Sequence, residues 1–439
     1  MAMTRRAVYA GLAMGAAYTW SPLTMVFVMG MVPLCAWGAR GLGVRERRWV
    51  LAALVAAIGL RVLAIATLIV TTDPAREQFR VFFPDAQFVI ARSWWILNNW
   101  RHVPIGPDQF RQIFNSYGAS SFNSFLAFVQ LLLGSAPYAV NLISVAAFVG
   151  GALMLFRLAQ RAYGPAPAVA GLLLLLFWPT LFAWSLSTLR EATQLLLMAG
   201  LFTAAMVGVR AREWTARGKA AAAGVAVLIV LVTLRADGFI VVALGLTLGL
   251  LFRLLTLRWW LPVVAVVALG VGALVLARDA TFQSQVAQQV TVAAGRHLGH
   301  VETPGGSFRL LDDRFYAEGA RSVDTFAFDE RVRFLLRSAV AFFTVPLPWR
   351  IDSLSGLTML PQQCVWYALL CLAAFGYRAA ARRDALFTAI LTACVVAGML
   401  IITPNSGNVG TLVRHRDMVV PAVVFLAAAG VYPAARAWA

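Results

Sequence analysis

The sequence predicts an all-α polytopic membrane protein with about 11 transmembrane helices and two extracytoplasmic loops that bear interfacial helices. Composition is the first reason: 61% of the 439 residues are apolar and 13% are charged, whereas soluble domains are about half apolar and one quarter charged. The second reason is that several apolar runs approach or exceed the roughly 18 to 20 residues that cross a bilayer. The third is that most basic residues fall between these runs.

Apolar runs separated by charged residues give the expected spans in chain order. They are residues 18–38, 49–71, 137–157, 165–184, 189–209, 218–235, 238–254, 259–277, 361–378, 384–403 and 417–435. The longest stretches between spans are residues 72–136 and 278–360, the first and second loop of one transmembrane domain that covers residues 1–439.

Arginine-rich connections follow every second span. They are Arg40 to Arg48, Arg157 and Arg161, Arg210 to Lys219, Arg253 and Arg258, Arg378 to Arg383, and finally Arg436. These connections hold 16 basic residues and three acids, and the opposite side receives the other 16 of the 19 acids. Because cytoplasmic loops are enriched in Lys and Arg, the arginine-rich side is predicted to be cytoplasmic and both long loops extracytoplasmic. The net charge of +18 is therefore explained by topology and does not indicate nucleic-acid binding.

Two apolar segments within the loops are too short to span. Residues 120–133 ("SSFNSFLAFVQLLL") and 331–345 ("RVRFLLRSAVAFFTV") are amphipathic and rich in aromatic residues. Such segments are typical of helices that lie in the membrane interface. Counting either as a span would invert the charge alternation downstream, so we expect both to lie parallel to the membrane.

Charged side chains gather on the predicted outer face. They are Asp85 in the first loop, Arg190 and Glu191, Arg235 and Asp237, Arg337 in the second loop, and Arg414, His415 and Arg416. A single charge at the rim of a bilayer usually extends its head group to water. Several charged sites on one face instead favour a shared cavity, and we expect Asp85, Arg190, Arg235 and Arg414 to line it.

Such a cavity suits transfer of a group from a lipid phosphate to a hydroxyl. Arginines bind phosphate through charge-assisted hydrogen bonds, and a nearby carboxylate can accept the proton of the attacking hydroxyl. Asp85 follows Pro84, a residue favoured at the first position of a helix. Asp85 can therefore stabilise the start of a helix, act as a general base, or do both.

The stretch "FFPDAQFVIARSWW" after the second span resembles the first extracytoplasmic loop of the GT-C glycosyltransferase superfamily. The resemblance continues through Ser120 to Ala192, and "VPLPWRID" and "GNVGTLVRHRDMVVP" are similar to late segments of bacterial polysaccharide members. It implies an inverting transferase of the bacterial inner membrane with Asp85 as general base and its active site on the extracytoplasmic face. Many members carry two adjacent acids in this loop, whereas Asp85 stands alone.

The resemblance also implies the partners. These are a polyprenyl-phosphate-linked sugar as donor, a glycan or lipid hydroxyl as acceptor, and the lipid bilayer. No cofactor is certain from it, although a divalent metal is possible. The other charged residues of the outer face would then bind substrate.

Two other functions remain open. An O-antigen polymerase or ligase would use Arg and His in the second loop, which leaves Asp85 unexplained. A flippase or transporter would place polar residues near mid-membrane, and only Arg61 lies there. For Arg61 itself, a functional role and packing against a neighbouring carbonyl are both open. His297 and His300 have a spacing that suits a metal, but we expect a solvated loop because no third ligand is evident.

Overall fold

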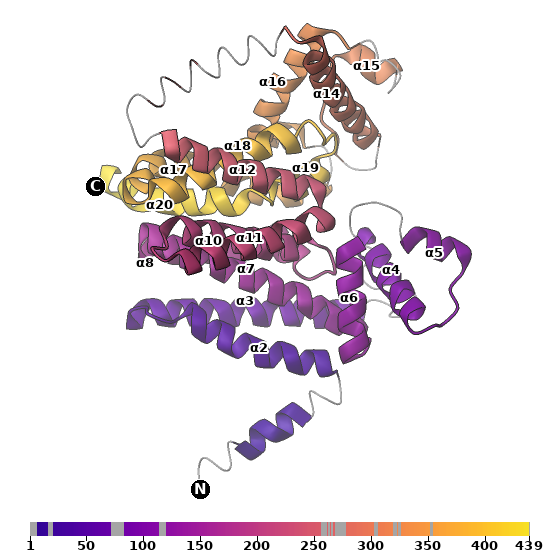
Figure 1. Ribbon diagram of the computed structural model, residues 1–439, viewed down its shortest axis with the longest axis vertical. Coiled ribbons are helices and arrows are strands. Elements are labelled where there is room, and N and C mark those ends of the chain that lie inside the picture. Colours follow the sequence, from indigo (N-terminus) through magenta and orange to yellow (C-terminus); the bar gives the residue numbers. More distant parts are fainter. Residues whose placement is uncertain are drawn as a thin grey trace. The chain divides into compact units, whose positions relative to one another are not determined.

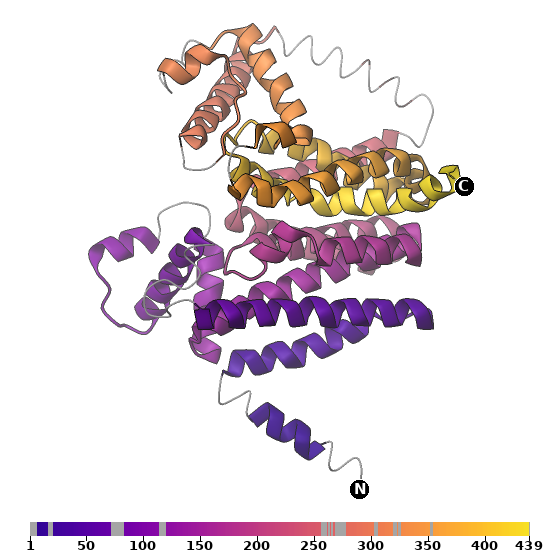
Figure 2. The same ribbon diagram turned by 180° about the vertical axis from the view of Figure 1, so that it is seen from behind.

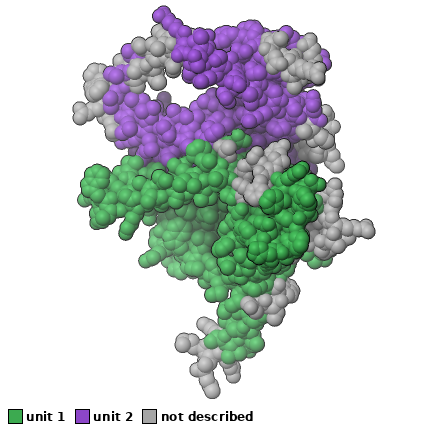
Figure 3. All heavy atoms as spheres, turned by 45° about the vertical axis from the view of Figure 1, so that its right-hand side comes forward, with its two compact units in different colours: residues 1–239 green, residues 240–439 purple. Residues whose placement is uncertain are grey.

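The computed structural model describes residues 7–15, 21–71, 83–113, 120–255, 261, 264, 267, 278–302, 306–318, 323, 326–351 and 354–438. These residues are almost entirely helical, and the only pairing of β type among them is an isolated bridge between Ser307 and Asn408. The chain divides into two compact units, residues 1–239 and residues 240–439 (Figure 3). The all-α class is therefore confirmed for the described residues.

Among the described residues, seven helices are long and apolar enough to cross a membrane. They are Val44–Thr71, Tyr138–Tyr163, Glu191–Arg210, Trp214–Leu234, Asp237–Leu255, Leu357–Arg383 and Ala385–Ile402. Each matches a predicted span. Three more predicted spans correspond to shorter apolar helices at Pro22–Gly38, Pro165–Leu176 and Val420–Val431. The predicted span at 259–277 lies outside the described residues except at three positions, so the total of about 11 stays a prediction.

Unit 1 is a layer of long helices with a crosswise helix at one end (Figures 1 and 2). The long helices are α2 (Pro22–Gly38), α3 (Val44–Thr71), α7 (Pro137–Tyr163), α8 (Pro165–Leu176), α10 (Glu191–Arg210) and α11 (Trp214–Leu234). Helices α7 and α10 pack closely because Gly151 has no side chain: a Cβ there would lie 2.9 Å from the backbone nitrogen of Leu196. Small residues allow this close approach of apolar helices.

The predicted span at 165–184 is wrong as one continuous helix. Helix α8 ends at Leu176 and a separate short helix, α9 (Pro179–Trp184), follows. Pro179 causes the break, because its ring disfavours a helical residue before it and it has no N–H to donate. Trp178 accordingly has an extended backbone with φ −62° and ψ 119°.

The first loop contains α4 (Pro84–Trp100), α5 (Pro107–Ile113) and α6 (Ser120–Leu133). Helix α6 begins and ends at the residues predicted from its amphipathic pattern, and it lies crosswise to the long helices of the unit (Figure 1). The three helices share a small core of Ile96, Leu97, Ile113 and Ala127.

Unit 2 contains most of α12 (Ala236–Leu255), whose first residues belong to unit 1, and all later helices. These are α14 (Ala280–Val301), α15 (Asp313–Glu318), α16 (Phe328–Thr344), the 3-10 helix η2 (Pro348–Arg350), α17 (Leu354–Arg383), α18 (Ala385–Ile402), α19 (Val409–Arg416) and α20 (Val420–Trp438). Helices α17 and α20 cross where Gly376 meets Gly430, whose added Cβ would lie 2.1 Å from the carbonyl oxygen of Leu372. The predicted interfacial segment at 331–345 is the C-terminal part of α16.

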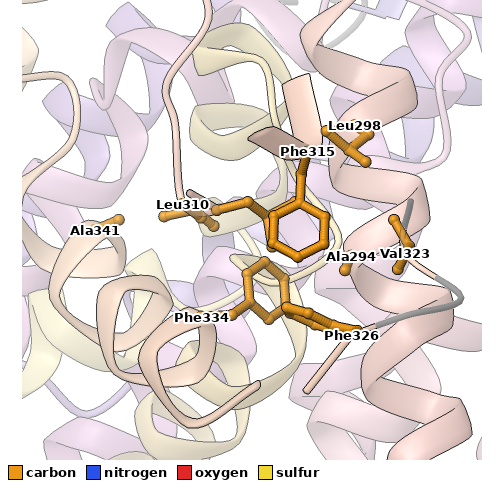
Figure 4. Packing of buried hydrophobic residues seen from close by; sticks show 9 residues of the cluster. Ala294, Leu298, Leu310, Phe315, Val323, Phe326, Phe334 and Ala341 are labelled. Atoms are coloured by element: carbon orange, nitrogen blue, oxygen red, sulfur yellow. The ribbon is translucent and has the colours of Figure 1, made fainter. Parts of the chain in front are cut away.

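Helices α14, α15 and α16 enclose a core of their own (Figure 4). The rings of Phe315, Phe326 and Phe334 meet at its centre, with centroids 5.2 Å apart for the first two and 5.9 Å for the last two. Edge-to-face aromatic pairs of this kind stabilise beyond the apolar area that they bury. The second loop is therefore a folded subdomain of unit 2 in its described part.

Contacts within unit 1 agree with the predicted alternation of its connections. Arg157, in a connection predicted to be cytoplasmic, donates a hydrogen bond to the carbonyl of Arg40 in another such connection. Segments predicted for the opposite end also meet. Arg190 donates a hydrogen bond to the carbonyl of Leu234, and Thr188 donates one to the carbonyl of Ala86. The connections that contain Arg40 and Arg157, assigned to one side by their charge, thus lie together.

Candidate functional site

The candidate site in unit 1 begins at the start of α4. Pro84 is the first residue of the helix, and Asp85, in the first turn, has an exposed side chain. The residues around it are fixed: Phe83 is 5% exposed, and its ring packs edge-to-face on Trp184 at 5.8 Å. The carbonyl of Ala86 accepts a hydrogen bond of 3.4 Å from the hydroxyl of Thr188. An exposed carboxylate is thus held at a helix start whose neighbouring residues are fixed by these contacts.

Helix α4 is also fixed from its other face by a buried amide. Gln130 of α6 donates a hydrogen bond of 3.0 Å to Ser93 and accepts one of 2.8 Å from the indole of Trp94. Gln130 is 1% exposed, so these bonds are shielded from water and strengthened. Trp94, one of the aromatic residues that follow Asp85, therefore anchors the helix to α6.

A second cluster joins the starts of α10 and α12 to the end of α11. The guanidinium of Arg235 lies 3.3 Å from the carboxylate of Glu191 and 3.5 Å from the amide oxygen of Gln194. Both ions are buried, at 7% exposed for Arg235 and 5% for Glu191. Gly238 makes room for this pair, because a Cβ at that position would lie 2.2 Å from the Gln194 amide. Burial makes removal of one partner costly, since it leaves a charge without compensation.

Arg190 stands between this pair and the start of α4. Its guanidinium donates a hydrogen bond of 2.9 Å to the carbonyl of Leu234, the last residue of α11, and its side chain is half-buried. Thr188, which contacts Ala86, is two residues before it. Chain geometry therefore keeps the Cα atoms of Asp85 and Arg190 within roughly 20 Å of each other. Asp237, in the first turn of α12, is half-buried close to the Arg235 pair.

Arg61 fixes the segment that carries these residues. It is fully buried in α3 and donates to three oxygens: Ser185 Oγ at 2.7 Å, the Leu176 carbonyl at 2.8 Å and the Ala57 carbonyl at 3.0 Å. Its guanidinium also lies over the rings of Phe148 and Phe182, at 4.4 and 4.5 Å. Of the two interpretations open for Arg61, the structure thus supports packing against neighbouring carbonyls. Arg61 thus links Leu176, the last residue of α8, to Ser185, the residue after α9. Ser185 begins the segment that leads to Arg190.

Arg337 in unit 2 belongs to a surface ion-pair network. Its guanidinium lies 2.7 Å from the carboxylate of Asp312, which Arg333 also contacts at 3.1 Å. Hydrogen bonds from Arg337 and Arg333 lower the pKa of Asp312 below its usual range. Arg337 also donates to the carbonyl of Leu310. These contacts orient α16 on the rest of its subdomain.

The late basic cluster divides into buried and partly exposed members. Arg416 is 3% exposed; it donates to Gln363 Oε1 at 3.2 Å and to the carbonyl of Val345, and it lies over the ring of Trp366 at 4.9 Å. Burial lowers its pKa to about 10, which leaves it charged at neutral pH. Arg414 and His415 on the same short helix, α19, are only half-buried.

The expectation of a solvated loop at His297 and His300 is wrong. His297 has no exposed surface, and burial lowers its pKa to about 4, so its imidazole is neutral. Its Nδ1 lies 2.7 Å from the carbonyl of Ser406 and its Nε2 lies 2.9 Å from the hydroxyl of Tyr316. Since the carbonyl can only accept, Nδ1 carries the proton and Tyr316 donates to Nε2. His300 Nδ1 similarly contacts the carbonyl of Asn405.

The predicted site residues therefore form two groups. Asp85, Arg190, Glu191, Arg235 and Asp237 lie in unit 1, and Arg337, Arg414, His415 and Arg416 lie in unit 2. The cavity expected to join both groups stays a prediction. Within the described ranges, no three His, Cys, Asp or Glu side chains are grouped as metal ligands would be.

Sequence reasoning missed the residues that hold the site in place. Gln194 lies one helical turn after Glu191, so the spacing could have indicated it. Thr188 and Trp184 contact α4 across about one hundred residues of sequence, and no local pattern marks such partners. No family model, curated protein or solved structure matches the chain.

Proposed function

We propose that the protein is a membrane glycosyltransferase. It would transfer a sugar from a polyprenyl-phosphate donor to a hydroxyl acceptor, with inversion, on the extracytoplasmic face of the bacterial inner membrane. One observation carries the proposal: Asp85 is exposed at the start of a rigid helix, and the residues on both sides of it contact the segment that leads to Arg190. A base and a cation for phosphate thus come from neighbouring parts of unit 1.

In this reaction the oxygen of the acceptor hydroxyl attacks the anomeric carbon of the donor sugar, while Asp85 accepts the proton of that hydroxyl. The bond from that carbon to the phosphate oxygen breaks, and polyprenyl phosphate leaves with the electron pair. Arginines stabilise the negative charge that develops on the leaving phosphate. Attack on the face opposite the phosphate inverts the configuration of the sugar.

The contacts narrow the choice of phosphate-binding arginine. Arg235 is paired with Glu191, Arg337 with Asp312, and Arg416 is enclosed by Gln363 and Trp366. We assign the phosphate to Arg190, which is half-buried in the segment that contacts the start of α4. Arg414, half-buried in unit 2, stays the other candidate. The polymerase alternative loses support because two Arg and His side chains of the second loop have structural partners: His297 is buried and Arg337 is paired with Asp312.

A matched pair of aspartates tests the role of Asp85. Helix α4 begins Pro84–Asp85 and helix α5 begins Pro107–Asp108, and both acids are exposed in the first turn. Asp85→Asn should lower single-turnover transfer from polyprenyl-phosphate sugars by roughly 10²–10⁴-fold, while binding of the radiolabelled donor persists. Asp108→Asn should leave the rate unchanged. Equal rates for wild type and Asp85→Asn would show that Asp85 only stabilises a helix start.

Arg414→Ala tests the other half of the mechanism. Loss of one charge-assisted hydrogen bond to phosphate, worth about 1.5–3 kcal/mol, should weaken donor binding roughly ten- to a hundredfold. The rate at saturating donor should fall less than the affinity. Unchanged donor affinity would remove Arg414 from the phosphate site and leave Arg190 as the candidate.

A further inference from the structure

The opposite end of α4 borders a hollow of about 550 Å³. It lies between the last turn of α4 and the short helix α5, and its lining includes Asn99, His102, Pro104, Pro107, Phe110 and Arg111. His102, Phe110 and Arg111 have exposed side chains. At 1.5 Å per residue, α4 separates Asn99 from Asp85 by roughly 20 Å. The hollow is therefore distinct from the candidate catalytic site.

His102 occupies a backbone position that favours glycine. Its φ is 55°, in the left-handed region, and it is the only such non-glycine residue among those described. The N–H of His102 donates to the carbonyl of Asn99 and the N–H of Val103 to that of Asn98, at 3.1 and 2.9 Å. This pair of bonds is the Schellman motif, in which the left-handed residue is usually glycine. Histidine lowers the stability of such a turn relative to glycine. We therefore infer that the imidazole of His102 has a role other than stabilising the turn.

The lining has the chemistry of a saccharide site with an anionic partner. The Arg111 guanidinium, the His102 imidazole and the Asn99 amide can all bond to hydroxyl or carboxylate groups. Phe110, 47% exposed, and two prolines add flat apolar surfaces against which the C–H face of a sugar ring can pack. An entirely apolar ligand would leave the three polar groups without partners.

We propose that this hollow binds an acidic sugar unit of the acceptor glycan. The acceptor role rests on the proposed glycosyltransferase function, whereas binding of an acidic saccharide does not. A site roughly 20 Å from Asp85 cannot contact the reacting atoms. It would instead hold a unit some distance along the glycan from the attacking hydroxyl.

Binding is measured on the full chain in detergent by saturation-transfer difference NMR. The probes are tetragalacturonate, the neutral maltotetraose and inorganic phosphate. Tetragalacturonate should bind, and both Arg111→Gln and Phe110→Ala should weaken it about tenfold. Arg101→Gln, an exposed arginine outside the lining, should leave binding unchanged. Absence of tetragalacturonate binding, or equal binding by Arg111→Gln, overturns the proposal. Equally tight binding of maltotetraose also overturns it, because the hollow would then not recognise the carboxylate. Full displacement of tetragalacturonate by equimolar phosphate overturns it as well, because the hollow would then not recognise the sugar.

His102→Gly separates a binding role from a structural one. Glycine suits the left-handed turn, so the variant should melt at a higher temperature and yet bind tetragalacturonate several-fold more weakly. A variant that is stabilised and binds as wild type does would overturn the argument from His102. Asp85→Asn should keep tetragalacturonate binding intact. If the wild-type protein binds tetragalacturonate but transfers no sugar from a polyprenyl-phosphate donor, the glycosyltransferase proposal fails while the saccharide site stands.

Discussion

Arg61→Met tests whether a buried arginine in a membrane helix can be structural. The substitution removes three hydrogen bonds and two aromatic contacts while it keeps an unbranched apolar side chain. The Leu176 carbonyl ends helix α8 and loses its donor, which costs about 1–3 kcal/mol. Two buried cation–π contacts add about 1–2 kcal/mol each. Relief of the desolvated charge offsets part of this loss, so we expect a net destabilisation of about 2–4 kcal/mol.

The lysine variant makes the test sharper. Arg61→Lys retains the charge, but a compact ammonium cannot reach Ser185 Oγ and the Leu176 carbonyl at once, as the planar guanidinium does. The charge would stay buried with fewer partners, which is worse than having no charge. We therefore expect the stability order wild type, then Arg61→Met, then Arg61→Lys, although lysine is the conservative change.

Melting in detergent, followed by tryptophan fluorescence at one fixed scan rate, measures these differences. At roughly 2 °C per kcal/mol, Arg61→Met should lower Tm by about 4–8 °C. Arg48→Met, at an exposed position of the same helix, serves as the control and should shift Tm by less than about 1 °C. A Tm for Arg61→Met equal to that of wild type, or Arg61→Lys more stable than Arg61→Met, would refute the reasoning.

Two further predictions concern the packing around α14. Burial lowers the pKa of His297 to about 4, so the unfolded chain binds this proton more tightly than the folded one. The neutral imidazole of His297 therefore contributes fully to the free energy of unfolding above about pH 6.5. This contribution, roughly 3 kcal/mol, is lost as the pH falls toward 4. Melting curves between pH 4.5 and 7 should show this slope in wild type and a smaller one in His297→Gln; identical slopes would contradict it. Gly407→Ala places a Cβ 2.1 Å from the His297 carbonyl oxygen, so it should lower Tm clearly. Gly299→Ala in α14 meets open space and should be neutral or stabilising; similar Tm shifts for both would count against the packing.

The helices of this chain could largely be predicted because their signals are local. Span length, hydropathy and the alternation of arginine-rich connections are read within windows of about twenty residues. The amphipathic stretch at Ser120–Leu133 gave the bounds of α6, and the segment at 331–345 gave most of α16. The break before Pro179 was missed because apolar composition continues through it, although proline at that position was a usable signal.

The environment of individual polar residues could not be predicted, because their partners are distant in sequence. Arg61 and Ser185 are 124 residues apart, and His297 and Ser406 are 109 apart. A histidine in a polar stretch gives no indication that a carbonyl and a tyrosine hydroxyl will enclose it. Long-range packing decided these cases, and it also buries two residues predicted to bind substrate, Arg235 and Arg416.

Two buried arginines and one half-buried arginine each donate a hydrogen bond to a carbonyl at a helix end. Arg61 donates to the carbonyl of Leu176 at the end of α8, Arg190 to that of Leu234 at the end of α11, and Arg416 to that of Val345 just after α16. The last carbonyls of a helix have no partner within it and carry the negative end of its dipole. In a membrane there is little water to satisfy them, so a guanidinium serves both needs at once.

These hydrogen bonds bear on how the candidate site should be tested. A guanidinium has five N–H donors. One hydrogen bond to a helix end therefore orients the group without using all of its donors. Arg190 combines such a bond with a half-buried side chain, in the segment held against the start of α4. Its loss would therefore combine a structural defect with any loss of phosphate binding. Asp85→Asn, at an exposed residue in the first turn of α4, therefore gives the cleaner measure of catalysis.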